Sequence, residues 1–270
     1  MRTIAFIGVG NMAGAIIGGM LGSGMVDHSH LVLSDCFPDK CARYVDNGAT
    51  LASSVAEAAA AADCVVLSVK PQNFSEILPE LATVPGINDK LIITIAAGIS
   101  INTVKSALHD APVVRVLPNT PMLIGQGVSV VCRAEDVSAA DFEFVCDAFR
   151  ASGRVHIIDE SEMNRIISVT SSSPAYVFLF INAILEGARA QGLPEEGLLD
   201  CICDMVIGSA ALLKAGDLTP AEQVKVVTSK GGTTERAMAV LNERDMTGMV
   251  IDAMRACTAR AEELDRASRG

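Results

Sequence analysis

TIAFIGVGNMA, at residues 3–13, decides the fold of the amino-terminal part of the chain. The β-branched run at 3–8 predicts a buried strand, and a G-x-G-x-x-A pattern that would open a helix follows it directly. The first glycine permits a tight turn, the second lets the backbone approach a pyrophosphate, and the small third residue lets the helix pack on the strand. The stretch predicts a dinucleotide-binding turn, with an ordinary glycine-rich turn as the alternative. The predicted cofactor contacts here are Gly8, Gly10, Asn11, Met12 and Ala13.

Short apolar runs alternate with helical patterns as far as residue 158. The runs that predict further strands lie at 31–35, 64–69, 91–95, 113–117, 128–132 and 155–158. The helices predicted between them lie at 12–22, 38–47, 57–62, 74–81 and 137–151. Because the strand runs are apolar throughout, we expect a mostly parallel sheet covered by helices on both faces. The pattern predicts an α/β, Rossmann-type, doubly wound domain over residues 1–160.

Strand signals end near residue 162, and helical patterns fill the remainder of the chain. The predicted helices span 163–171, 175–191, 195–215, 220–227, 234–243 and 248–266. The breaks between them contain glycine and proline, the residues that usually end helices. We expect an all-helical second domain over residues 161–270.

Composition and charge exclude several classes of function. Half of the 270 residues are hydrophobic and 20% are charged, which excludes a disordered chain. The net charge of −11 and the scattered basic residues argue against a nucleic-acid partner. The apolar stretches are predicted to be too short or too interrupted for a membrane span, and no secretory leader is visible. Eight cysteines without a C-x-x-C pair and four isolated histidines predict free thiols, no metal site and a cytoplasmic location.

Three turns follow the predicted strands at the edge where open parallel sheets bind ligands. Each turn alone could be ordinary turn chemistry, but three on one edge favour a ligand crevice. The candidate cofactor contacts in these turns are Val69, Lys70, Pro71, Ala97, Gly98 and Asn119. Of these, Ala97 and Asn119 are the candidates for contacts near a nicotinamide ring.

Ser34 and Asp35 end the second predicted strand and are further candidate cofactor contacts. An acidic residue at this place usually accepts hydrogen bonds from the adenosine ribose, and it would repel a 2′-phosphate. Asp35 therefore favours NADH over NADPH, although Lys40 and Arg43 lie close in sequence and weaken that argument. A turn or helix-capping role ahead of Pro38 is the alternative for Asp35, and the choice between the two cofactors stays open.

The run VTSKGGTT, at 227–234, precedes a predicted helix. Two glycines that lead into hydroxyl residues at a helix start expose backbone N–H groups and form a nest for an anion. Capping of the helix by Thr233 or Thr234 is the alternative. The residues alone do not decide between these two roles.

Six motifs in this order resemble the pyrroline-5-carboxylate reductase family. They are FIGVGNMA (6–13), SVKPQ (68–72), AAGIS (96–100), VRVLPNTP (114–121), SSPAYVF (172–178) and VTSKGGTTERAMAVL (227–241). Together they span nearly the whole chain. Ser171 departs from the family, which usually carries glycine there, and it bears on the fine geometry of the substrate site.

The resemblance implies hydride transfer from NAD(P)H to 1-pyrroline-5-carboxylate, which gives L-proline. It implies a helical dimerisation domain, an interlocked dimer that can assemble into a larger ring such as a decamer, and a substrate loop supplied by the partner subunit. Thr234 matches the family position that hydrogen-bonds the ring nitrogen, which makes it the implied catalytic residue. The implied substrate contacts are Ser229, Gly231, Gly232, Thr233 and Thr234.

Two other functions remain as alternatives to the cyclic-imine reductase. A hydroxyacid dehydrogenase would place a lysine acid in the helical domain, but Lys214, Lys225 and Lys230 do not sit in such a motif. A dinucleotide sensor without activity would not need the Gly-Gly-Thr-Thr loop. An iminium carbon is already electrophilic, so the absence of an obvious general acid fits an imine reductase.

Overall fold

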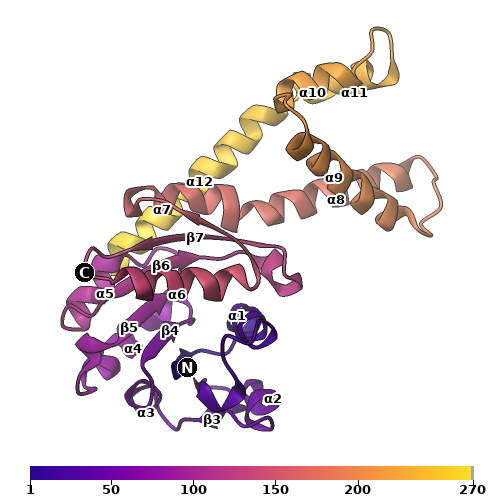
Figure 1. Cartoon of the computed structure of the whole chain (residues 1–270). Coiled ribbons are helices and arrows are strands. Elements are labelled where there is room, and N and C mark those ends of the chain that lie inside the picture. Colours follow the sequence, from indigo (N-terminus) through magenta and orange to yellow (C-terminus); the bar gives the residue numbers. More distant parts are fainter. Residues whose placement is uncertain (269–270) are drawn as a thin grey trace. The chain divides into compact units, whose positions relative to one another are not determined.

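The chain divides into two compact units (Figure 1). One comprises residues 1–174 and 256–270, and the other comprises residues 175–255. The structure is a computed structural model that describes residues 1–268, so the last two residues of the predicted helical domain lie outside the described residues. The predicted division into 1–160 and 161–270 stays a prediction.

An eight-stranded sheet forms the first unit within the described part of the chain, in the order β3-β2-β1-β4-β5-β6-β7-β8. The strands are β1 (Ile4–Ile7), β2 (Leu31–Ser34), β3 (Thr50–Leu51), β4 (Cys64–Leu67), β5 (Leu91–Thr94), β6 (Val113–Leu117), β7 (Gly127–Arg133) and β8 (Gly153–Ile157). Only β6 and β7 pair antiparallel among these described strands. The predicted doubly wound, mostly parallel sheet is confirmed.

The central strands are buried along their whole length, as their unbroken apolar runs predict. In β1, Ile4 lies between Leu31 of β2 and Cys64 of β4, and all three side chains are buried. This register aligns the carboxyl ends of β1, β2, β4 and β5 at one edge. The turns expected to bind the cofactor therefore lie at that edge.

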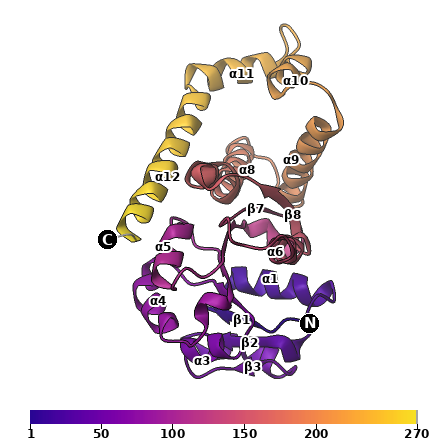
Figure 2. The ribbon, with the colours of Figure 1, turned by 60° about the vertical axis from the view of Figure 1, so that its left-hand side comes forward.

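Helices cover both faces of the sheet (Figure 2). On one face α3 (Val55–Ala60) contacts α4 (Phe74–Ala82), which contacts α5 (Ile101–Ala107). On the other face α1 (Asn11–Gly22) contacts α6 (Ala139–Arg150). The first unit also contains the short helices α2 (Ala42–Val45) and α7 (Met163–Ile166).

Short turns complete the first unit. They are the 3-10 turns η1 (His28–His30), η2 (Pro38–Lys40), η3 (Pro71–Asn73), η4 (Ile87–Asp89), η5 (Thr120–Ile124) and η6 (Glu160–Glu162), and the π-helical turn η7 (Ile167–Ser171). The helix predicted at 38–47 is divided into η2 and α2, and the one predicted at 163–171 is divided into α7 and η7. A π turn inserted next to an α-helix often marks a functional site.

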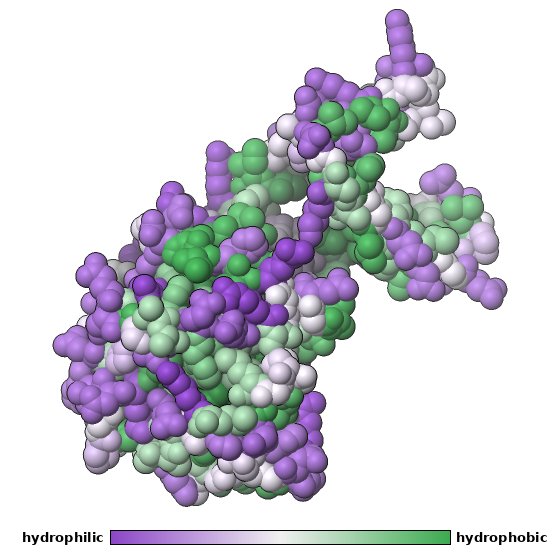
Figure 3. All heavy atoms as spheres, in the orientation of Figure 1, coloured by the Kyte–Doolittle hydropathy of each residue, from purple (hydrophilic) through white to green (hydrophobic). Residues whose placement is uncertain are grey.

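The second unit is helical and has almost no core of its own. It contains α8 (Ser173–Ala190) from residue 175, α9 (Leu198–Ala215), α10 (Pro220–Val227), α11 (Thr233–Glu243) and the first half of α12 (Met246–Ser268). Among residues 175–255, Ala188 and Ile202 are the apolar side chains that are buried. Figure 3 shows hydrophobic side chains on the surface of these helices. Such a unit needs a further surface to cover it.

One stretch bears on the expectation that no segment could cross a membrane. The helical stretch Glu160–Ala190 contains an 18-residue window with a mean hydropathy of 1.4 and is long and apolar enough to do so by length and composition alone. The core helix of a soluble protein passes the same test, so the expectation stays a prediction for this stretch.

Candidate active site

The first glycine turn has the geometry that a pyrophosphate requires. Gly8 has a φ of +89°, and a Cβ there would lie 2.8 Å from Cγ1 of Val69. A Cβ on Gly10 would meet no atom within 4 Å, so the space beside the turn is open. Ala13 is buried against the sheet, and no side chain caps α1. The free N–H groups at the start of α1 are therefore available to an anion.

Asp35 lies under this turn and not on an open surface. Its Oδ2 accepts a hydrogen bond of 2.7 Å from the Val9 N–H, and its Oδ1 accepts one of 2.8 Å from the Phe37 N–H. Burial would raise the pKa of Asp35, but these N–H groups and the nearby Lys40 outweigh burial and lower it. The turn role left open for Asp35 is present in the structure. A contact with the ribose stays a prediction.

Ser34 joins the same corner through its backbone. The Ser34 carbonyl accepts a hydrogen bond of 2.8 Å from the Gly8 N–H, and its side chain is nearly buried. Val69 packs against Gly8, whereas Lys70 is exposed and Pro71 opens η3. The structure thus brings the turns after β1, β2 and β4 together, as predicted from their positions.

The turn after β5 packs against the carboxyl-terminal part of α12, which also belongs to the first unit. Gly98 has a φ of +71°, and a Cβ there would lie 2.6 Å from the Leu264 Cβ and 3.1 Å from the Ala261 carbonyl oxygen. Ala97, beside it, is half-buried. α12 therefore sets the position of the Ala97–Gly98 turn.

Asn119 braces the turn after β6. Its Nδ2 donates a hydrogen bond of 3.0 Å to the Thr170 carbonyl, and its Oδ1 accepts one of 2.8 Å from the Val128 N–H. Only 7% of the residue is exposed. The side-chain amide thereby ties the turn to the π turn η7 and to β7. A direct contact with the nicotinamide stays a prediction.

Arg115 of β6 escaped sequence reasoning. It is 1% exposed and reaches Glu160 and Asn164. Near it in the chain's first unit, the Ser171 hydroxyl is buried and has no hydrogen-bond partner among the described residues, and Ser172 Oγ lies 3.2 Å from Cys257 Sγ. The sequence did hold a clue to this hydrogen-bond network around Arg115, because a single arginine interrupts the apolar run at 113–117.

The Gly-Gly-Thr-Thr loop belongs to the second unit and is not capped by threonine. Gly232 is the residue at the helix start, and α11 has no side-chain cap. The capping role considered for Thr233 and Thr234 is therefore wrong: they occupy the first two helical positions. Neither their N–H groups nor their hydroxyls bond another described residue, so they are available to a ligand.

The two glycines of the loop have distinct roles. Gly231 has a φ of +75°, and its N–H donates a hydrogen bond of 2.8 Å to Glu235 Oε2. The Gly232 N–H bonds the Ser229 carbonyl at 3.0 Å, and a Cβ on Gly232 would lie 2.5 Å from Ser229 Oγ. The exposed Ser229 side chain therefore lies against Gly232, and only glycine fits at that position without a shift of the hydroxyl. Lys230 is exposed beside the nest.

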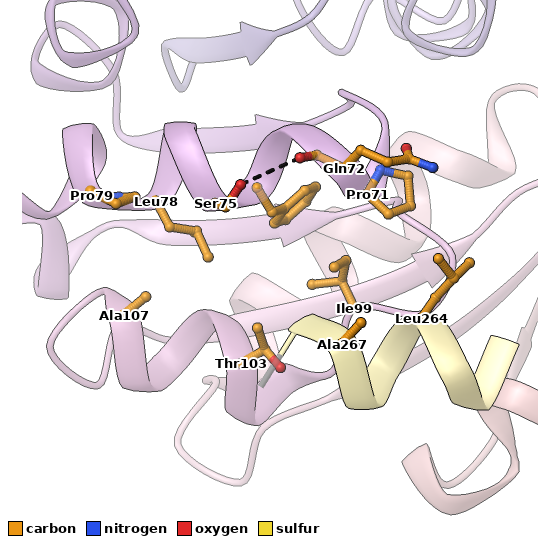
Figure 4. A pocket seen from close by; sticks show the side chains of 11 residues that line it. Pro71, Gln72, Ser75, Leu78, Pro79, Ile99, Thr103, Ala107, Leu264 and Ala267 are labelled. Carbon is orange, nitrogen blue, oxygen red and sulfur yellow. Dashed lines mark hydrogen bonds between the residues drawn. The ribbon is translucent and has the colours of Figure 1, made fainter. Parts of the chain in front are cut away.

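A larger hollow lies on the α4–α5 face of the first unit (Figure 4). Its volume is about 530 Å³, and apolar side chains such as Leu78, Ile99 and Leu264 line it. No ionisable side chain lines this hollow, so it offers no side-chain acid or base. Within residues 1–268 no group of three or more His, Cys, Asp or Glu side chains could hold a metal ion.

Two family models match the chain. One described as "Pyrroline-5-carboxylate reductase dimerisation" matches residues 160–264. Another, described as "NADP oxidoreductase coenzyme F420-dependent", matches residues 3–98. The two matches fall on the helical part and on the glycine-turn half of the sheet.

Whole-chain relatives agree with these matches. The pyrroline-5-carboxylate reductase of Escherichia coli is 35% identical over 268 residues, which cover 98% of this chain and 99% of the relative. A Plasmodium falciparum pyrroline carboxylate reductase with NADP bound superposes with a TM-score of 0.90 at 25% identity, and 98% of each chain is covered. A Coxiella burnetii pyrroline-5-carboxylate reductase superposes with a TM-score of 0.85 at 30% identity. The match covers 97% of this chain and 98% of that structure.

Proposed function

The chain belongs to the pyrroline-5-carboxylate reductase family, and we propose that it reduces 1-pyrroline-5-carboxylate to L-proline with NAD(P)H, the last step of proline biosynthesis. It is an NAD(P)H-dependent oxidoreductase that reduces the C=N bond of a cyclic imine to CH–NH. The observation that carries the substrate assignment is the uncapped start of α11 behind two glycines. A carboxylate suits that place, because N–H groups and the helix dipole both favour negative charge.

The cofactor lies along the carboxyl edge of the sheet in this proposal. The N–H groups at Gly10, Asn11 and Met12 hold the pyrophosphate, and the open side of Gly10 gives it room. When bound, the nicotinamide supplies the hydride. The other proposed cofactor contacts are Gly8, Ala13, Ser34, Asp35, Val69, Lys70, Pro71, Ala97, Gly98 and Asn119.

The loop residues orient the substrate. The N–H groups of Thr233 and Thr234 hold the carboxylate on the start of α11, while Ser229, Gly231 and Gly232 shape the turn. The Thr234 hydroxyl forms a hydrogen bond with the protonated ring nitrogen and so keeps that proton in place. Orientation of an iminium that is already electrophilic can supply about 7–11 kcal/mol of barrier reduction. A dedicated His or Lys acid is therefore unnecessary.

The protein self-associates through its helical dimerisation domain. The second unit supports an interlocked dimer, because Phe178 and Leu179 are 60% and 69% exposed there, while Ala188 and Ile202 are its buried apolar side chains over residues 175–255. In this dimer the Gly-Gly-Thr-Thr loop of one subunit serves the cofactor site of the other. We extend the proposal to a larger ring such as a decamer and to the domain division 1–160 and 161–270.

We place the protein in the cytoplasm. All eight cysteines are free in the structure, which suits a reducing compartment. The apolar face of the stretch Glu160–Ala190 would be covered by the partner subunit, since the dimerisation match begins at residue 160.

The proposal is tested with purified protein, 1-pyrroline-5-carboxylate and each reduced cofactor, by following the loss of nicotinamide absorbance. We expect loss that requires the imine, and a linear 2-keto acid should not replace it. Faster oxidation with the 2-keto acid would favour the hydroxyacid dehydrogenase. Cofactor binding without any turnover would favour the sensor.

A further inference from the structure

The Gly-Gly-Thr-Thr loop begins with a four-residue turn over 229–232. The Gly232 N–H donates a hydrogen bond of 3.0 Å to the Ser229 carbonyl and closes this turn. Gly231, its third residue, has a φ of +75°, whereas Lys230, its second, has a negative φ. A negative φ followed by a positive one is the pattern of a type II turn. A type I turn differs by a flip of the peptide between these two central residues, and glycine in third place permits both forms.

Glu235 holds the peptide that would flip. The N–H of that central peptide belongs to Gly231, and it donates a hydrogen bond of 2.8 Å to Glu235 Oε2. Glu235 lies in the first turn of α11, where the helix dipole stabilises a carboxylate. A flip to the type I form would turn the Gly231 N–H away and break this hydrogen bond. The Glu235 carboxylate therefore favours the type II form.

The direction of this peptide matters for an anion at the start of α11. Because Glu235 belongs to the first turn of that helix, the Gly231 N–H points toward the helix start. A flipped peptide would point the Lys230 carbonyl oxygen there instead. Its partial negative charge would face the place where the N–H groups of Thr233 and Thr234 are free for a ligand, and it would disfavour a carboxylate.

We propose that Glu235 is a positioning residue of the substrate loop: it holds the Gly231 N–H and so keeps the loop in the form that accepts the substrate carboxylate. This inference deepens the proposed function and rests on it. The negative charge of Glu235 itself opposes a second carboxylate, so its benefit comes through the hydrogen bond. Glutamine, which keeps an acceptor oxygen without the charge, should therefore replace it.

The preceding helix offers a matched control. Glu222 lies in the first turn of α10, and its Oε2 accepts a hydrogen bond of 2.8 Å from the Thr219 N–H. That hydrogen bond belongs to a capping box and not to a glycine turn. Glu222 and Glu235 are both exposed, so replacing either creates no cavity and the variants should fold. Glu222→Ala loses the same kind of contact without touching the substrate loop.

The test is steady-state kinetics of the full-length protein with 1-pyrroline-5-carboxylate and saturating reduced cofactor. Glu235→Ala should raise KM roughly 10-fold and change kcat by less than about 3-fold, because the substrate carboxylate is held equally before and during hydride transfer. Glu235→Gln should keep KM within about 2-fold of the wild type, and Glu222→Ala should leave it unchanged. The Kd for NADH, measured by fluorescence without substrate, should be the same in all variants, which shows that the cofactor domain is intact.

Three results would overturn the inference. A wild-type KM in Glu235→Ala would remove the positioning role, and a lower KM would make Glu235 a competitor that the substrate displaces. An equal rise of KM in Glu235→Gln would assign the effect to charge. In each case the wild type still reduces 1-pyrroline-5-carboxylate, so the proposed function stands. Wild-type protein that binds NADH but does not reduce this imine overturns the proposed function, and the inference with it.

Discussion

Thr233 and Thr234 occupy the first turn of α11, and neither hydroxyl is used by the fold. Thr234→Ala should lower kcat/KM by roughly 10- to 1000-fold, because one positioned polar group near the reacting atoms is lost. Steady-state kinetics with 1-pyrroline-5-carboxylate measures this. Thr219 offers a control, since its hydroxyl caps α10. Thr219→Ala should cost about 1 kcal/mol of stability with kinetics unchanged. Near-wild-type kinetics for Thr234→Ala would remove its catalytic role.

Cys36 follows Asp35 and is exposed, which makes it a reporter of cofactor binding that needs no turnover. Burial raises the pKa of Cys64 and of Cys132 to about 12, so these thiols stay protonated and unreactive at neutral pH. We expect an alkylating reagent at pH 8 to modify Cys36 much faster than either, and NADH to slow the reaction.

Peptide mass spectrometry would follow each thiol in this experiment. Cys201 is exposed in the second unit and provides an internal reference that cofactor should not protect. Equal labelling rates at Cys36 with and without saturating cofactor would place the adenosine elsewhere.

Local sequence predicts the backbone of the site better than its side-chain contacts. The glycine turn and the Gly-Gly-Thr-Thr loop were predictable, because steric rules for glycine and helix starts act over a few residues. The bracing role of Asn119 was not, since its partners Thr170 and Val128 are brought to it by the tertiary fold. The same holds for Arg115, whose partners lie 45 and 49 residues away.

At the scale of elements, α12 and the turn after β5 are packed so closely that only glycine fits at position 98. Gly98→Ala should destabilise the protein by roughly 2 kcal/mol or more, because both the left-handed backbone and the contact with Leu264 disfavour a Cβ. Gly24→Ala is the matched control: Gly24 has a φ of +72° but no atom within 4 Å of the added Cβ.

Denaturant unfolding measures the free energy of unfolding of both glycine variants. The loss in Gly98→Ala should exceed the loss in Gly24→Ala, and the excess reports the packing of α12. Equal losses would mean that only backbone strain acts at residue 98.

Two short elements, α5 and β3, were not predicted. α5 has only seven residues, of which Ile101, Thr103 and Val104 are β-branched, so its helical signal is weak. β3 has two exposed residues and no apolar run. β3 pairs with β2 in the sheet, and α5 packs against β6 and α4, so tertiary contacts and not local sequence stabilise both elements.

At the scale of the whole molecule, the second unit exposes more large apolar side chains than it buries. Leu179→Asp should weaken self-association and lower activity, since the proposed site needs the loop of a partner. Light scattering coupled to size-exclusion chromatography measures the mass. Leu51→Asp, in the first unit and 43% exposed, should leave the mass unchanged. A monomeric wild type with full activity would contradict the shared site.

The sequence pattern indicated two kinds of architecture but not the path of the last helix. The period of a helix reveals which face is apolar and not which element that face meets. The final residues of α12 therefore could not be assigned to the first unit, although 261 and 264 touch Gly98 there. The alternation of strands and helices did predict a parallel sheet, because each pair of parallel strands requires a crossover connection, usually a helix.

Hydride transfer to the imine carbon is the central claim, and isotope tracing tests it most directly. Reduced cofactor that carries deuterium at both positions on C4 of the nicotinamide would be incubated with the protein and 1-pyrroline-5-carboxylate, and the product would be analysed by mass spectrometry and NMR. Our account predicts L-proline with one deuterium, on the former imine carbon. Oxidation of the cofactor without deuterated proline would contradict it.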